Sequence, residues 1–406
     1  MLVKVTKLAK LIKKSKHMVF YTGAGISTSA NIPDFRGPNG IWTRKDAGLP
    51  PPKMDKALNQ VEPTLTHMGM LALINKDLLK FITSQNVDGL HLKSGIPMEK
   101  LSELHGNCFI ERCDKCHRTY FRSFSVSDIN HDEIDTSAMS WGQLKHMTGR
   151  RCKTNSCLGI LKDTIINFGE NLPEDELSKA SENASTCDLA VCWGSSLTVS
   201  PACNLPKQTL KLKGGKLVII NLQPTPLDQK CHLKIHAKTD RVMELLLGQL
   251  KIDAPTFGGD YYKQTIEISI TPLEKTMKLL VQGKDIGRAN GFFGIEKVEI
   301  SSNSFDYKRV IRWEPLEFTM PLPTKSTTVN VSVFFYGITK PIEHTIQLEL
   351  ENLKAISEEV QVDFEKLAYE QPTPTKPDQP KKIIDDLNLQ DNEEDDTHSD
   401  SVCNLQ

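Results

Sequence analysis

Short apolar runs recur along the first 255 residues, each separated from the next by a helix-like segment and a polar loop. The runs lie at residues 18–21, 78–83, 164–168, 189–193 and 217–220. Each is apolar nearly throughout, as expected of a parallel strand that is covered on both faces. The pattern predicts a parallel sheet with helices between its strands, and hence an α/β fold.

The first segment of the chain is basic and amphipathic. Leu8, Leu11 and Ile12 recur at helical spacing, and the first apolar run follows soon after. We interpret the segment as the first helix of the fold, because it lacks the apolar centre and the cleavage site of a signal peptide. Another helix is expected from Thr64 to about Leu73.

Small or amide residues follow each of the five apolar runs. These strand-end segments are Gly23-Ala24-Gly25, Gln85-Asn86, Gly169-Glu170-Asn171, Gly194-Ser195-Ser196 and Asn221-Leu222-Gln223. Any one of them could be an ordinary turn. In open α/β sheets, however, ligands bind outside the carboxyl ends of the strands. Five such segments predict a Rossmann-like, doubly wound sheet with a dinucleotide crevice.

The first strand end is expected to turn directly into a helix N-terminus. Its unpaired amides would bind a pyrophosphate, and the glycines would keep side chains away from it. The loop after it carries Asp34, Phe35 and Arg36 between two prolines. No acidic residue follows a clear strand end about twenty residues on, as it does in dehydrogenases. This counts against hydride transfer and favours chemistry at the nicotinamide end of the cofactor.

Four of the ten cysteines form two closely spaced pairs, Cys113 with Cys116 and Cys152 with Cys157. Four thiolates complete a zinc tetrahedron and leave no position for water or substrate, so the zinc would be structural. Four unconnected buried cysteines are the alternative. The zinc module would be inserted at about residues 107–165, with a surface excursion at 125–149. The cysteine usage without a signal peptide favours a reducing compartment.

His105 lies between the nucleotide-binding part and the zinc module, beside Gly106 and Asn107. By residue type alone, His67, His91 and His236 have similar standing as candidate bases. The position of His105 at the junction favours it as the general base.

The sequence changes character beyond residue 255. Residues 260–355 alternate in strand fashion between turn residues, which predicts an antiparallel β-sandwich-like unit with a packing or partner-binding role. Residues 371–406 are expected to form a disordered acidic tail. From residue 372 on, nine acidic and three basic residues leave the rest of the chain at about +5, which is compatible with an anionic partner such as chromatin. No apolar run has transmembrane length, so no membrane partner is expected.

Several motifs in a fixed order resemble the sirtuins, the NAD-dependent protein deacylases, over about residues 4–255. They are G-A-G-I-S-T, I-P-D-F-R-G-P-N-G-I-W, S-Q-N-V-D-G-L-H, L-H-G-N, the two Cys pairs, N-F-G-E, G-S-S-L and I-N-L-Q. The segments E-P-T-L-T-H-M and N-L-Q-P-T-P-L-D are similar to the branch that contains mammalian sirtuins six and seven.

The resemblance implies that NAD is consumed when an acyl-lysine oxygen attacks its nicotinamide ribose. His105 would be the general base, Asn86 would hold the ribose and a water, and Asp88 would bind the nicotinamide carboxamide. The remaining NAD contacts would be Ala24, Gly25, Thr28, Asp34, Phe35, Arg36, Trp42, Gln85, Gly194, Ser196, Asn221, Gln223 and Thr239. The acyl-lysine peptide would pair as a strand beside Gly169, Glu170 and Val199, with Phe168 flanking the lysine tunnel.

The leading hypothesis is therefore an NAD-dependent protein-lysine deacylase that acts on histone or other chromatin proteins and forms O-acyl-ADP-ribose. The nucleus is the expected location, with the cytoplasm as the alternative. Protein mono-ADP-ribosylation is a second hypothesis, since another nucleophile could intercept the same chemistry. A non-catalytic NAD-sensing chromatin scaffold is a third.

Overall fold

The computed structural model describes residues 1–122, 124–126, 145–154, 156–258, 263–283, 295–302, 307–311, 316–335, 340–349, 351 and 353–363. Most of the predicted surface excursion at 125–149 and the whole predicted acidic tail lie outside the described residues. Among the described helices, none combines the length and apolar character needed to cross a membrane.

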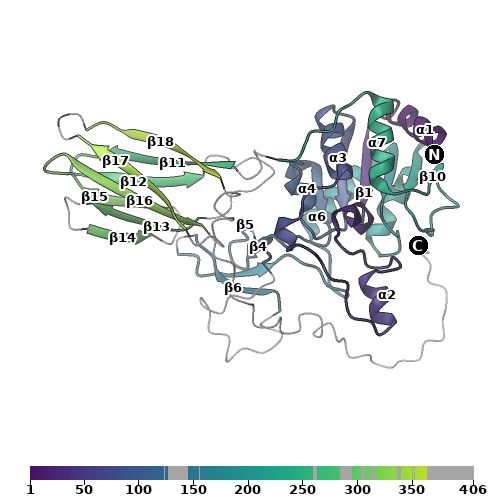
Figure 1. Ribbon diagram of the computed structural model, residues 1–406, viewed down its shortest axis with the longest axis horizontal. Coiled ribbons are helices and arrows are strands. Elements are labelled where there is room, and N and C mark those ends of the chain that lie inside the picture. The colour runs from purple at the N-terminus through teal and green to yellow at the C-terminus, as the bar shows by residue number, and fades with distance from the viewer. Residues whose placement is uncertain are drawn as a thin grey trace.

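A six-stranded parallel sheet forms the centre of the larger part of the molecule (Figure 1). Its spatial order is β10 (Leu233–Ile235), β9 (Lys216–Ile220), β8 (Leu189–Trp193), β1 (Met18–Thr22), β2 (Leu79–Ser84) and β3 (Leu101–Glu103). The chain runs outward from β1 to β3, then returns to the other side of β1 and runs outward again. The order therefore reverses between β1 and β8, where doubly wound sheets open a crevice.

Helices cover both faces of this sheet, as the α/β prediction requires. They are α1 (Leu2–Ile12), α2 (Ile41–Asp46), α3 (Leu65–Asn75), α4 (Leu90–Lys93), α6 (Glu174–Thr186) and α7 (Thr239–Leu250), with 3₁₀ turns at 24–26, 28–30, 58–60, 98–100 and 202–211. Successive residues of β1 point to opposite faces. Phe20 packs into the cluster that includes Leu8 of α1 and Val242 of α7, whereas Tyr21 packs into the cluster that includes Ala180 of α6. The expected first helix and the helix after Thr64 are both confirmed.

Four of the five predicted strands are confirmed, but the prediction at 164–168 is wrong. This segment follows β7 without strand structure and packs along the loop that carries His105. The Ile166 amide donates to the His105 carbonyl at 3.0 Å, and the Ile165 and Asn167 amides donate to carboxylates of Asp163 and Glu170, so these three amides do not pair with a neighbouring strand. Two strands of the parallel sheet, β3 and β10, were not predicted, because three residues are too short for a recognisable apolar run.

A small antiparallel sheet carries the four paired cysteines. Its order is β5 (Thr119–Phe121), β4 (Ile110–Cys113), β7 (Ile160–Asp163) and β6 (Met147–Arg151). Its interior contains an ion triad in which buried Glu111 accepts from Arg122 at 2.5 Å and from Arg150 at 2.8 Å. With so few apolar side chains of its own, this sheet depends on such polar links and on the cysteine cluster.

The C-terminal unit consists of two four-stranded antiparallel sheets, as the alternating pattern predicts. One is β15 (Glu317–Pro321), β12 (Thr276–Gly283), β11 (Lys263–Pro272) and β18 (Ile356–Asp363); the other is β14 (Tyr307–Ile311), β13 (Ile295–Ser302), β16 (Thr327–Phe335) and β17 (Ile342–Leu348). Both sheets contribute to one hydrophobic cluster. Strand β18 extends the unit to Asp363, past the predicted limit at 355.

Candidate active site

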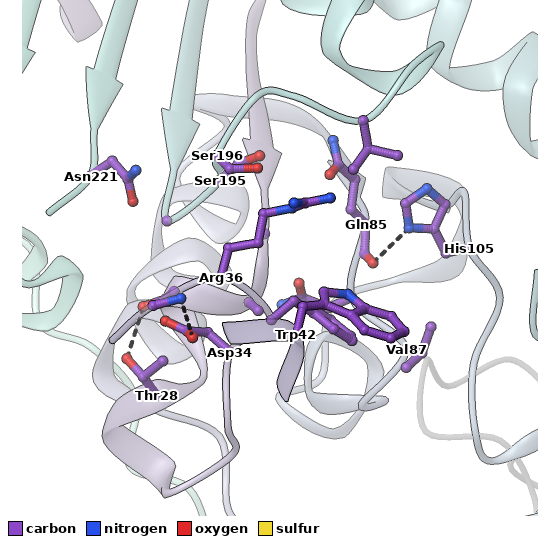
Figure 2. A pocket seen from close by; sticks show the side chains of 18 of the residues that line it. Thr28, Asp34, Arg36, Trp42, Gln85, Val87, His105, Ser195, Ser196 and Asn221 are labelled. Carbon is purple, nitrogen blue, oxygen red and sulfur yellow. Dashed lines mark hydrogen bonds between the residues drawn. The ribbon is translucent and has the colours of Figure 1, made fainter. Parts of the chain in front are cut away.

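A deep cleft of about 2040 Å³ opens at the carboxyl ends of the parallel strands (Figure 2). Segments that follow all six strands contribute to its wall, from Gly23 after β1 to Thr239 after β10. Pockets for single small ligands usually measure about 300–1,000 Å³. The cleft therefore has room for a dinucleotide together with part of a second substrate.

The turn after β1 does not continue into a helix with free amides, so that prediction is wrong. The Gly25 amide donates to the Gly194 carbonyl at 2.9 Å, and the Ile26 and Ser27 amides donate to carbonyls within the turn at 3.1 and 3.0 Å. Only two three-residue 3₁₀ turns follow the strand. Three of the amides expected to bind a pyrophosphate, those of Gly25, Ile26 and Ser27, are thus already engaged by the protein.

The glycines of this turn are explained by close packing against the turn after β8. A Cβ atom on Gly23 would lie 2.8 Å from the Ser195 Cα, and one on Gly25 would lie 2.8 Å from the Gly194 Cα. Gly194 itself has a φ of 60°, a region that favours glycine. The glycines let the β1 and β8 turns touch at the point where the strand order reverses, which forms the floor of the cleft.

His105 is a half-buried histidine in the cleft wall whose tautomer follows from its hydrogen bond. Its Nδ1 lies 3.0 Å from the Gln85 carbonyl oxygen (Figure 2). A carbonyl can only accept, so Nδ1 carries the proton and Nε2 is the basic nitrogen of the neutral ring. Burial lowers the pKa of His105 below its ordinary value, against the opposing effect of the Gln85 hydrogen bond. The ring is therefore neutral and able to accept a proton near pH 7.

Asn86 and Asp88 follow β2 but differ in their access to the cleft. Asn86 lines it, and its buried Oδ1 has no hydrogen-bond partner among the described residues. Asp88 lies behind the wall, where its carboxylate accepts from Ser27 Oγ at 2.6 Å and from the Leu90 amide at 3.0 Å. Burial raises the pKa of Asp88, and these two hydrogen bonds oppose the rise. The structure thus places Asn86 at the cleft surface and Asp88 behind it, and the contact of Asp88 with the nicotinamide carboxamide stays a prediction.

The proline-flanked loop forms one side of the cleft. Its fold is held by the Asp34 carboxylate, which accepts from the Gly37 amide at 2.8 Å, and by the Trp42 amide, which donates to the Phe35 carbonyl at 2.9 Å. The Gln223 side chain, from the segment after β9, donates to the Arg36 carbonyl at 3.2 Å. Figure 2 shows the Arg36 side chain reaching into the middle of the cleft.

An aromatic group links this loop to the segment before Glu170. The ring of Trp42 lies 6.2 Å from Phe35 and 6.0 Å from Phe168, centroid to centroid. Phe168 remains 59% exposed. Large exposed aromatic side chains at the mouth of a cleft provide apolar surface for a ligand.

All predicted cofactor- and substrate-binding residues line the cleft. Of the three predicted catalytic residues, His105 and Asn86 line it and Asp88 does not. Those that line it are Ala24, Gly25, Thr28, Asp34, Phe35, Arg36, Trp42, Gln85, Asn86, His105, Phe168, Gly169, Glu170, Gly194, Ser196, Val199, Asn221, Gln223 and Thr239. Among the lining residues that the sequence reasoning missed are Lys45, Leu65, Lys145, His146, Asp163, Asp240, Arg241 and Glu244. Only the position of Asp240 directly after Thr239 could have indicated one of them.

The four paired cysteines converge in the small sheet. Their ligand atoms all lie within 4.8 Å of one another, and the Cys113–Cys157 and Cys116–Cys152 Sγ pairs are each 3.6 Å apart. A tetrahedral zinc ion with Zn–S bonds of about 2.3 Å requires sulfur–sulfur distances of about 3.8 Å. A Cβ atom on Gly159 would lie 2.3 Å from the Cys113 sulfur, so the site needs a glycine there. The cluster fits a closed, structural zinc site.

Tyr120 supports one of these sulfurs. Its hydroxyl accepts from the Lys153 amide at 3.0 Å and lies 3.1 Å from the Cys152 sulfur. Because a hydroxyl has one proton, and the Lys153 bond uses only a lone pair, the proton is available for the sulfur. Tyr120 is buried, so this hydrogen bond is shielded from water.

The fold and site define a doubly wound α/β protein with a cleft at the sheet edge and a four-cysteine module. The model of the Sir2 family matches residues 51–201. A Drosophila melanogaster protein named NAD-dependent protein deacetylase Sirt6 is 41% identical over 254 residues, which cover 63% of this chain and 77% of that protein. The chain therefore belongs to the Sir2 family.

Two further relatives add to this picture. Arabidopsis thaliana NAD-dependent protein deacetylase SRT1 is 40% identical over 311 residues, or 76% of this chain and 63% of that protein. Human NAD-dependent protein deacetylase sirtuin-7 is 42% identical over 263 residues, or 63% of this chain and 62% of that protein. The resemblance to the branch of sirtuins six and seven is thus confirmed. The chain spans less than two thirds of the length of these two relatives. The alignment with the Arabidopsis protein is long enough to extend past the parallel sheet into the C-terminal β unit.

Proposed function

We propose that the protein is an NAD-dependent protein-lysine deacetylase. The observation that carries this proposal is the position of His105, a neutral base whose ring lines a cleft formed by all six strand ends. Membership of the Sir2 family supports it, as do the names of the relatives. When bound, NAD supplies an electrophilic ribose carbon to the acyl oxygen of the lysine substrate.

The residues of the chain then have distinct tasks. His105 Nε2 accepts a proton from a ribose hydroxyl, and the Gln85 carbonyl keeps the ring in the required tautomer. The unpartnered Oδ1 of Asn86 accepts a hydrogen bond from a ligand hydroxyl. Asp88 holds Ser27, which lies within 3.4 Å of the Asn86 side chain, and so positions Asn86. The aromatic group around Trp42 keeps water from the reacting atoms.

A zinc ion at the four cysteines would hold the strands and turns of the small module together without taking part in chemistry. The closed set of thiolates leaves no coordination position for substrate. We also propose that the acylated substrate is a histone or another chromatin protein and that the enzyme acts in the nucleus. The charge of about +5 outside the residues from 372 on is compatible with association with the anionic surface of chromatin.

Product analysis tests the proposal. The full chain is incubated with NAD and an acetyl-lysine peptide of histone sequence, and the products are identified by mass spectrometry. We expect the deacetylated peptide, nicotinamide and O-acetyl-ADP-ribose in equal amounts. The His344→Ala variant, altered in β17 of the C-terminal unit, should give the same products at the same rate.

Two results would contradict this function. ADP-ribose attached to protein, with the acetyl group retained, would indicate the transferase alternative. NAD binding without any product would indicate a non-catalytic scaffold.

A further inference from the structure

Four charged residues meet at the mouth of the cleft, and the proposed chemistry uses none of their side chains. Lys145 and His146 precede β6, Asp163 ends β7, and Glu170 follows the Phe168 segment. His146 Nδ1 lies 2.9 Å from an Asp163 oxygen, and His146 Nε2 lies 3.0 Å from a Glu170 oxygen. Lys145 also forms an ion pair with Glu170. The cluster therefore joins the small cysteine-bearing sheet to the substrate side of the cleft.

The geometry identifies the charge state of His146. Each ring nitrogen faces a carboxylate oxygen, and an ionised carboxylate only accepts hydrogen bonds. A neutral imidazole has one N–H and could satisfy only one of the two. His146 is therefore an imidazolium that donates to both Asp163 and Glu170. Its side chain is 20% exposed, against 56% for Lys145, so its ion pairs are the better shielded from water.

The two carboxylates in turn hold the backbone of the segment between them. Asp163 accepts from the Ile165 amide at 2.9 Å, and the second oxygen of Glu170 accepts from the Asn167 amide at 2.7 Å. The Glu170 amide donates back to the Asn167 carbonyl at 3.1 Å, which closes a tight turn. The position of this turn thus depends on where His146 places the Glu170 carboxylate.

The same segment is tied to the proposed general base. The Ile166 amide donates to the His105 carbonyl at 3.0 Å, and Phe168 contacts the Trp42 ring across the cleft. The backbone at His146 has a φ of 65°, which non-glycine residues adopt only at a cost. The Asp163 amide donates to the His146 carbonyl at 2.7 Å and helps to hold this conformation.

We propose that His146 is a positioning residue that, through Asp163 and Glu170, fixes the 163–170 segment as one wall of the binding site for the acyl-lysine peptide. The peptide-binding role of this wall rests on the function proposed above. His146 itself touches no reacting atom. Removing it should weaken peptide binding and leave NAD binding and the chemical step largely intact.

The positioning depends on pH in a defined direction. Among the residues that the structure describes, Asp163 of β7, Glu170 of the turn and the neighbouring Lys145 are the charged groups that face His146 or its partners. The two carboxylates raise the pKa of His146 to about 9, against the effect of burial. A raised pKa means that the imidazolium links are present at neutral pH and are lost as the pH rises through about 9. The Michaelis constant for the peptide should therefore rise in that range.

Hydrogen exchange tests the inference without reference to activity. In the full-length His146→Gln variant at pH 7, the amides of Asn167 and Glu170 should exchange about 10-fold faster than in the wild type, because the carboxylate that closes the turn then keeps only the more exposed Lys145 as its charged partner. The matched control is His344→Gln. His344 also pairs with a carboxylate, at 2.6 Å from Glu358, and is similarly buried, but it lies in β17. Unchanged exchange at 165–170 in His146→Gln would overturn the inference, whatever the activity of the protein.

Steady-state kinetics supply the second test. His146→Gln should raise the peptide Michaelis constant about 10-fold with kcat changed less than about 2-fold, and should abolish its rise near pH 9. Glu170→Gln removes the same link together with the Lys145 ion pair, so the double variant should be no worse than Glu170→Gln alone. Additive losses, or a fall in kcat alone, would contradict the positioning role. If the wild type releases no nicotinamide with peptide, the proposed function fails, while the exchange experiment still decides the role of His146.

Discussion

The parallel sheet and the C-terminal β unit distribute their polar groups in different ways. All five residues of β1 are buried, and the polar residues of this sheet gather where its strands end. In β16, buried and half-exposed side chains alternate, and polar side chains pair with the adjacent strand, as Thr345 does with Asn330 at 3.0 Å. The residues that line the cleft lie between Gly23 and Glu244. Polar groups that converge at strand ends are available for a ligand, whereas those paired across strands stabilise the sheet itself.

The largest effect is expected from substituting Gly106, which lets the His105 loop lie directly against the Thr164 backbone. A Cβ atom on Gly106 would lie 1.8 Å from the Thr164 carbonyl oxygen, at a φ of 81°. Gly106→Ala should displace the His105 loop, lower stability by more than about 3 kcal/mol and reduce peptide-dependent nicotinamide release at least about 100-fold.

Gly214→Ala is the matched control for this substitution. Gly214 has a φ of 84°, and no heavy atom of the described residues lies within 4 Å of its Cβ position. Only the backbone cost of about 1 kcal/mol should appear in thermal unfolding, with activity retained. Equal effects of the two substitutions would show that backbone conformation matters here and close packing does not.

A core substitution in the C-terminal β unit should lower the stability of that unit without lowering the activity of the α/β part. Phe335 is fully buried in the cluster shared by the two antiparallel sheets. Phe335→Ala should destabilise that unit by about 3–5 kcal/mol. Calorimetry should show one transition shifted to lower temperature, while nicotinamide release by the α/β part stays within about 2-fold of the wild type. Loss of activity in parallel with that transition would show that the activity of the α/β part depends on the folded C-terminal unit.

Tyr120→Phe should loosen the cysteine cluster by a smaller amount. It removes the hydroxyl that lies 3.1 Å from the Cys152 sulfur. Supporting hydrogen bonds of this kind are worth about 10–100-fold in metal affinity. Zinc transfer to a chromogenic chelator should be faster by about that factor, whereas Tyr21→Phe, in β1, should not change it. Equal rates of zinc transfer in the wild type and in Tyr120→Phe would contradict a supporting role of the hydroxyl at the cysteine cluster.

The smallest effect is expected in the acidic range of the pH dependence of kcat/KM for the peptide. Burial lowers the pKa of His105 below the ordinary value of 6.5, so the neutral base persists as the pH falls through 6.5 and is lost only below it. The kcat/KM for the peptide should accordingly stay constant at pH 6.5 and decline at lower pH. A decline that begins at or above that value would indicate a different base.

The sequence predicts most of the sheet because buried parallel strands are continuous apolar runs, and it predicts the cleft because their ends carry glycine and amide residues. The three-residue strands β3 and β10 have no such pattern. The segment at 164–168 is apolar without being a strand, because its Ile165, Ile166 and Phe168 side chains line the cleft. Local sequence could not reveal that the Gly25 amide is used by Gly194, because that contact joins residues far apart in the chain.

The cysteine cluster and the charged cluster at His146 show the same limit at the level of the site. The spacing of the four cysteines along the chain is enough to indicate a metal site, because zinc ligation imposes regular spacings. His146 has no motif around it, and its two carboxylate partners lie 17 and 24 positions along the chain. Such a group becomes visible only when the fold brings its members together.

A paired measurement on His105→Ala decides whether His105 is the base of a reaction at the edge of the parallel sheet. NAD affinity is measured by calorimetry, and nicotinamide release is measured with a saturating acetyl-lysine peptide. We expect an affinity within about 3-fold of the wild type and a release rate about 10²–10⁴-fold lower. Wild-type release by this variant, at unchanged NAD affinity, would contradict the assignment of His105.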